Sequence, residues 1–209
     1  MSKQLFLMAL CNNFSFDFLA RLFVQTDVSM FILDRIPVLK LQVNNLKFNI
    51  SSFLSHSALR LTCNHSGYEP LWREQLGTEW REPNREAFTY PVLETEDQRW
   101  QIRAAIDAVV AAAYGLTRAQ YAHVLSTFSH KSYLQAPHLC LNYFDELQAI
   151  GLETFTRKYD PYWDIPLNEN LPQPVIDLPI PITPPQDPEL LDTSQFINEV
   201  KPKKRKSKK

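Results

Sequence analysis

The strongest constraint on the fold of this chain is a pair of helix-capping boxes separated by a glycine. In such a box a threonine hydroxyl accepts the amide hydrogen of a residue three positions later, whose glutamine side chain reaches back. The boxes are formed by Thr95 with Gln98 and by Thr117 with Gln120, and Gly115 between them suits the left-handed conformation that ends a helix. The pattern predicts a helix, a three-residue turn and a second helix.

The first of these helices has two distinct faces. Arg99, Arg103 and Asp107 follow one another at four-residue spacing on one face. The other face is an apolar stripe made of Ile102, Ile106, Val109, Val110, Ala113 and Tyr114. Because an apolar stripe of this kind packs into a core, we expect this helix to organise the core.

Periodicity and proline content predict the remaining elements. The helices are expected over 4–24, with a break or kink at Asn12 and Asn13, over 50–62, over 70–76, and over 141–159 with an interruption at Gly151; a short strand is expected over 28–33. Nine prolines between positions 161 and 188 favour an extended arm. The expected fold is mainly α with a few short strands, a helical hairpin core, a Pro-rich extended C-terminal arm and a disordered basic tail.

Charge is distributed unevenly along the 209 residues. The tail KPKKRKSKK holds seven of the 22 basic residues, so residues 1–200 carry 15 basic against 23 acidic side chains. A body this acidic is not a broad phosphate-binding surface, and any nucleic-acid contact has to come from a local patch, the tail or a partner. Three distant cysteines and the lack of a membrane-length apolar run favour a soluble, cytoplasmic protein with no membrane partner.

The sequence lacks the motifs of the common catalytic and metal sites. The four glycines are isolated, which argues against a nucleotide-binding turn. The run Asp160-Pro161-Tyr162-Trp163 lacks the second proline of an amine-binding loop and is interpreted as a chain-reversing aromatic anchor. Cys63 with His65, and His138 with Cys140, lack zinc-knuckle spacing, so no metal site is expected, and His123 is interpreted as structural.

Two features leave room for DNA contact. Residues 118–128 offer Arg118, Gln120, His123, Ser126 and Thr127 as a possible recognition helix, although helical hairpins that only pack are commoner than those that read DNA. The tail lysines and arginine can bind a duplex without sequence preference, or serve as a solubilising terminus or nuclear-import signal. The predicted DNA contacts are Arg118, Gln120, Lys203, Lys204, Arg205 and Lys206.

Several segments resemble one family in the family's own order. RWQIRAAIDAVVAAAYGLTRAQYAHVLSTF (99–128) and LFLMALCNNFSFDFLARLFVQTDVSMFILDRIPV (5–38) are similar to the C-terminal region of type IIG restriction-modification and phage-defence adenine-specific DNA methyltransferases. YEPLWREQLGTEW and YFDELQAIGLETFTRKYDPYWDIPL resemble further parts of that region. Asn13 stands where the family commonly has serine, and the family's second proline is absent after Pro37.

The resemblance implies a domain plan and a function. It divides the chain into the end of a target-recognition-like segment (1–63), a loop-rich connector (64–94), a helical C-terminal segment (95–168) and the arm with its tail (169–209). The cofactor-binding glycine motif and the Asn-Pro-Pro-Tyr loop, which lie upstream in the family, are missing. The implied function is a non-catalytic DNA-recognition or docking fragment of a bacterial enzyme, with double-stranded DNA and a separately encoded catalytic subunit as partners. S-adenosylmethionine would bind only to the missing upstream domain. The alternative is a helical protein-interaction module with a non-specific nucleic-acid-binding tail.

Overall fold

A computed structural model describes residues 2–23, 36, 50–83, 85–86 and 89–168. These residues belong to one compact unit, Met1–Leu171; the rest of the chain, Pro172–Lys209, is assigned to a second. The predicted strand over 28–33, the arm beyond residue 168 and the tail residues Lys203, Lys204, Arg205 and Lys206 lie outside the described residues.

The described part of the chain is helical and contains no strand. Its eight α-helices are α1 (Ser2–Cys11), α2 (Phe14–Phe23), α4 (Ile50–Thr62), α5 (Glu69–Leu76), α6 (Glu96–Ala113), α7 (Arg118–Ser126), α8 (Ala136–Ile150) and α9 (Leu152–Tyr159), with a 3-10 helix at Ser66–Tyr68. The prediction of a mainly α fold is confirmed.

The Asn-Asn pair breaks the first predicted helix into α1 and α2. The Asn13 side chain is buried; its Oδ1 accepts the amide hydrogen of Phe16 at 2.8 Å, and its Nδ2 donates to the carbonyl of Leu10. Asn13 therefore caps the start of α2 while it satisfies a carbonyl at the end of α1. The two helices diverge by 73°.

The capping boxes and glycine turns form as predicted. Both backbone and side-chain hydrogen bonds of each box are present, at Thr95 before α6 and at Thr117 before α7. Gly115 has a φ of 72°, and Gly151 between α8 and α9 has a φ of 80°. These are positive angles that residues with a Cβ adopt at a cost, so glycine is required at both turns. The last long helix begins at Ala136, earlier than expected, because Pro137 suits the first turn of a helix.

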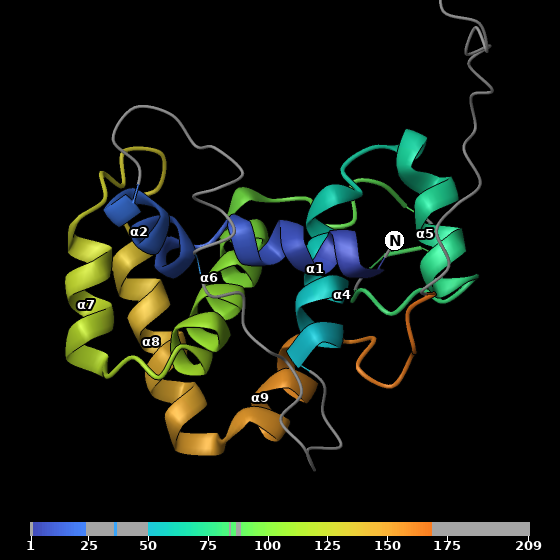
Figure 1. The fold of residues 1–209 in the computed structure, drawn as a ribbon. Helices are drawn as coiled ribbons and strands as arrows, with labels where there is room; N and C mark the ends of the chain where they lie inside the picture. The colour runs from blue at the N-terminus through green and yellow to red at the C-terminus, as the bar shows by residue number, and fades with distance from the viewer. Residues whose placement is uncertain (1, 24–35, 37–49, 84, 87–88, 169–209) are drawn as a thin grey trace, which may run out of the picture. The chain divides into compact units, whose positions relative to one another are not determined.

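The hairpin core is the main point at which the fold differs from the prediction. The turn at Gly115 forms, but α6 packs chiefly against α8, and α7 packs against α8 and α2 rather than against α6 (Figure 1). Helix α6 is the central element, since every residue from Ala104 to Ala111 is buried. With both faces covered by neighbouring helices, α6 lies within a bundle instead of forming one half of a two-helix core.

The apolar face of α1 and α2 is largely covered within the chain. Leu5, Phe6, Leu10 and Phe16 are buried in the main core, and α1 packs along α4. The exposed apolar side chains of this region are Leu7, Met8, Leu22 and Phe23. No single described helix has the length and apolar character needed to cross a bilayer; α1 and α2 meet these criteria only when they are taken together, as a bent pair.

Candidate functional site

Helix α7 corresponds to the possible recognition helix, and the two side chains predicted to contact DNA from it, Arg118 and Gln120, both have partners within the chain. The Arg118 guanidinium lies 2.7 and 3.0 Å from the two carboxylate oxygens of Asp145 on α8. The Gln120 side chain accepts the backbone amide hydrogen of Thr117 at 2.9 Å as part of the capping box. DNA contact by Arg118 would have to compete with Asp145, and DNA contact by Gln120 would break the box.

Two further polar side chains at the end of α7 are also occupied. The hydroxyl groups of Ser126 and Thr127 each donate, at 2.7 Å, to a backbone carbonyl three residues earlier. His123 is exposed and meets the ring of Phe18 edge-on, with centroids 6.3 Å apart. Beside it lies a shallow, mainly apolar hollow of about 450 Å³, lined by Phe18, Leu116, Ala119, Gln120, His123 and Val124. This surface favours apolar contact over hydrogen bonding to base edges.

Asp107 is buried, which corrects the expectation of a polar stripe shared with Arg99 and Arg103. Its Oδ1 accepts the backbone amide hydrogen of Phe14 at 2.9 Å, at the first residue of α2. Desolvation by burial raises the pKa of Asp107 to about 8, although hydrogen bonds from the Phe14 and Ser15 amides favour the carboxylate and lower the pKa. Asp107 thus binds the amino end of α2 from the middle of α6.

An aromatic cluster joins the same end of α2 to the segment that follows α7. The ring of Phe14 lies 5.0 Å from that of Phe128 and 5.1 Å from that of His130, between centroids. The guanidinium of Arg21 lies 4.5 Å from the centroid of the Phe128 ring. The segments 5–38 and 99–128, which are far apart in sequence, therefore meet through Asp107 and Phe14.

Sequence reasoning missed a buried histidine–aspartate pair. His56 Nδ1 on α4 lies 2.7 Å from Asp160 Oδ2, and both side chains are at most 1% exposed. His56 Nε2 is buried and has no hydrogen-bond partner among the described residues. His56 and Asp160 are 104 residues apart, and no local sequence pattern predicts a contact over that separation. The available signal was the four-residue spacing of His56 and Arg60, the only two basic side chains of α4.

The Asp160–Trp163 turn is an anchor, as predicted. Asp160 Oδ1 accepts the Tyr162 amide hydrogen at 2.9 Å, which closes the turn. The buried Tyr162 packs edge-on against Trp72, and its hydroxyl accepts the Arg81 amide hydrogen at 3.0 Å. The turn thereby ties the end of the described body to α5 and the loop after it.

The basic side chains of the body are mostly neutralised. Every arginine within the described ranges lies within 4.0 Å of a carboxylate: Arg21, Arg60, Arg73, Arg81, Arg85, Arg99, Arg103, Arg118 and Arg157. One of these pairs is buried, where Arg60 holds Glu82 and also donates to the Tyr159 carbonyl at 3.1 Å. Neutralised arginines release few counterions from DNA, so the described body has no broad cationic face.

The possible metal ligands remain dispersed. Cys63 and Cys140 are buried, whereas His65 and His138 are exposed. The residues that the structure describes contain no group of three or more histidine, cysteine or acidic side chains able to hold a metal ion. His65 instead caps the 3-10 helix, since its ring accepts the Gly67 amide hydrogen at 3.1 Å.

Comparisons of the chain with protein-family models, with curated proteins and with solved structures find no match.

Proposed function

We propose that this chain is a non-catalytic DNA-recognition or docking region of an adenine-specific DNA methyltransferase of a restriction-modification or phage-defence system. Its partners would be double-stranded DNA and a catalytic part that carries the S-adenosylmethionine and amine-binding motifs. The proposal begins from the family-like order of the segments 5–38 and 99–128.

The observation that carries the proposal is the junction of these two segments. The aspartate of IDAVVAAAYGLT is Asp107, and it caps α2, which follows directly on the Asn12-Asn13 pair of the other segment. Residues that characterise the resemblance are thus used to hold one helical body together, and not as an exposed catalytic group. A helical body in which these residues serve packing suits a module that positions DNA or a partner for chemistry performed elsewhere.

DNA binding by the full-length chain tests this proposal. A matched variant has the seven basic residues of 201–209 replaced by glutamine, so its length is unchanged. Both proteins are incubated with a random-sequence duplex library, and the bound fraction is sequenced. We expect both proteins to enrich the same duplex sequences, because the tail adds affinity without sequence preference. Loss of all enrichment in the glutamine variant would reject the recognition role.

Methyl transfer provides a second test. The chain alone, with S-adenosylmethionine and duplex DNA, is expected to transfer no methyl group to adenine. Addition of a catalytic subunit encoded by a neighbouring gene is expected to produce transfer at the sequences enriched above. Methyl transfer by the chain alone would contradict the non-catalytic assignment.

A protein-interaction module is the second candidate, and the apolar hollow beside α7 favours it. Phe18, Leu116 and Ala119 line this hollow, and Leu22 and Phe23 on the adjacent α2 are exposed. Exposed apolar side chains of this kind mark protein contacts more often than DNA contacts. In this case DNA binding would depend entirely on the basic tail and would show no sequence preference.

A further inference from the structure

The amino end of α2 lies over a buried carboxylate. Asp107 is 3% exposed, and its Oδ1 accepts the amide hydrogen of Phe14 at 2.9 Å. Among the described residues, burial and hydrogen bonds from the Phe14 and Ser15 amides shift the pKa of Asp107, and no cation takes part. Because two amides do not replace the hydration of an ionised carboxylate, the pKa is raised to about 8. Asp107 therefore keeps its proton at neutral pH while α2 covers it.

The other titratable side chains that face Asp107 are neutral at the same pH. Tyr121 on α7 and Cys140 on α8 are both buried, and burial is the main cause that raises the pKa of each group. Within the described residues, α1, α4 and α9 contribute no group that shifts the pKa of Asp107. On the α2 side, Asp17 forms an ion pair at the surface, and His130 contacts α2 from the turn after α7. Asp107 is thus the buried group of this junction that can change its charge near neutral pH.

The break before α2 allows this helix to move as a unit. Asn12 Nδ2 donates to the Met8 carbonyl at 2.7 Å, and Asn13 Nδ2 donates to the Leu10 carbonyl, so the end of α1 is capped without α2. Asn13 Oδ1 accepts the Phe16 amide hydrogen and caps α2. Because each helix has its own cap, the angle of 73° between them can change without the loss of a helical hydrogen bond.

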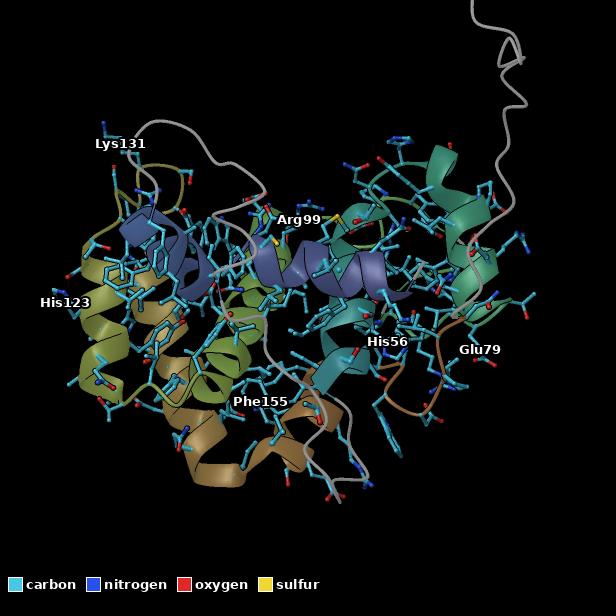
Figure 2. The ribbon with its side chains drawn as sticks, viewed as in Figure 1. His56, Glu79, Arg99, His123, Lys131 and Phe155 are labelled. Atoms are coloured by element: carbon cyan, nitrogen blue, oxygen red, sulfur yellow. The ribbon has the colours of Figure 1, made fainter. Side chains whose placement is uncertain are left out.

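Few side chains of α2 are buried against the body. Ser15 and Phe16 are the buried residues among its ten, whereas eight of the 13 residues of α4 are buried. Figure 2 shows α2 at the edge of the described body beside α7, which carries the labelled His123. The Phe18 ring meets His123 only edge-on, with centroids 6.3 Å apart. A helix with so little buried surface opens at a lower free energy than the whole body.

We infer that α2 is a proton-controlled latch on the body. While Asp107 carries its proton, α2 stays closed over it; when the proton leaves to solvent, α2 swings about Asn12 and Asn13, and water reaches the carboxylate. Ionisation thereby uncovers the apolar side of α2, which includes Phe16. The inference goes beyond the proposed function and does not depend on it.

The size of the effect follows from proton linkage. The open state binds the proton with the ordinary pKa of 3.8, and the closed state binds it with a pKa of about 8. The closed state is therefore fully favoured below about pH 4, and this advantage is lost as the pH rises towards about 8. The opening constant, which is the ratio of open to closed molecules, rises about tenfold for each pH unit in this window.

Hydrogen exchange followed by mass spectrometry measures this opening in the full-length chain. Exchange is recorded at several pH values between about 5 and about 8, and each rate is corrected for the intrinsic exchange rate at that pH. We expect the protection factor of α2 to fall about tenfold per pH unit and to stay below that of the central helix α6. This comparison uses the unsubstituted protein and depends on no variant.

Two matched variants identify the group responsible. Asp107→Asn has no proton to release, so the protection factor of α2 should be constant over the same pH range. Asp145→Asn removes a surface carboxylate that accepts hydrogen bonds from Arg118, and it should leave the pH dependence of α2 unchanged.

Three results would overturn the inference. A protection factor of α2 that does not vary with pH would show that its opening does not uncover Asp107. Equal protection of α2 and α6 at every pH would show that water reaches Asp107 only when the whole body unfolds. An unchanged pH dependence in Asp107→Asn would assign the effect to another group. None of these measurements uses DNA, so each outcome leaves the proposed function to its own test.

Discussion

Substitution of Asp107 tests the junction on which the proposed function depends. Asp107→Ala removes the carboxylate oxygen that accepts the Phe14 amide hydrogen, while Asp107→Asn keeps an acceptor at nearly the same place without the charge. The two variants therefore separate the contribution of the hydrogen bond from the cost of burying a carboxylate.

The expected loss for Asp107→Ala follows from the geometry. A buried or partly buried donor left without an acceptor costs about 1–3 kcal/mol, and loss of a helix N-cap costs about 0.5–2 kcal/mol. Both figures describe the same hydrogen bond at the start of α2, so they are not added. We expect Asp107→Ala to lower the free energy of unfolding by about 2 kcal/mol relative to Asp107→Asn.

The comparison with the unsubstituted protein depends on pH. Burial raises the pKa of Asp107 from 3.8 to about 8, so the folded state retains a proton that the unfolded state releases. Stability from this group is fully present below about pH 4 and is lost as the pH rises through about 8, by at most about 1.4 kcal/mol per pH unit. Because asparagine does not titrate, Asp107→Asn should gain stability relative to the unsubstituted protein over this range.

Urea unfolding followed by tryptophan fluorescence, at several pH values between about 5 and about 8, measures these differences. We expect Asp107→Asn to be the most stable of the three proteins near pH 8, with an advantage that shrinks as the pH falls. An Asp107→Asn variant as unstable as Asp107→Ala at every pH would refute the replaceable acceptor, and an advantage over the unsubstituted protein that does not change with pH would refute the raised pKa.

Three further substitutions test the fold around the candidate site. His56→Ala leaves the Asp160 carboxylate buried without its partner and should destabilise the chain by about 3–5 kcal/mol, whereas His56→Ala combined with Asp160→Ala should recover part of this loss in a thermodynamic cycle. Gly115→Ala places a Cβ at a φ of 72° and should lower the free energy of unfolding, measured by thermal unfolding, by about 1–2 kcal/mol. An unchanged free energy of unfolding would show that the turn has another conformation in solution. Thr117→Ala removes one capping box and should cost about 1 kcal/mol; an unchanged melting temperature would contradict the role of this cap.

The occupied polar side chains of α7 change how a helix-turn-helix pattern is interpreted in this chain. Side chains suited to base edges are present in sequence, but Gln120, Ser126 and Thr127 all make short-range hydrogen bonds to the backbone of their own helix or its cap. Composition of a helix therefore overestimates the number of side chains available to a ligand. The availability of a donor depends on whether a closer acceptor already binds it.

Local features of the sequence predicted the helix boundaries closely. The caps at Thr95 and Thr117, the break at Asn13 and the ends of helices at Gly115 and Gly151 all depend on interactions within about four residues. Such interactions are encoded by residue type and spacing alone, and for that reason they could be identified before the structure was known.

Tertiary structure decided which elements pack together and which polar groups are buried. The pairing of α6 with α8, the contact of Asp107 with Phe14 across 93 residues and the contact of His56 with Asp160 across 104 residues have no local signature. A charged residue at helical spacing is compatible with an exposed face or with a buried one that finds a partner. Only the arrangement of the other helices supplies that partner, and for Asp107 the partner is the Phe14 amide at the amino end of α2.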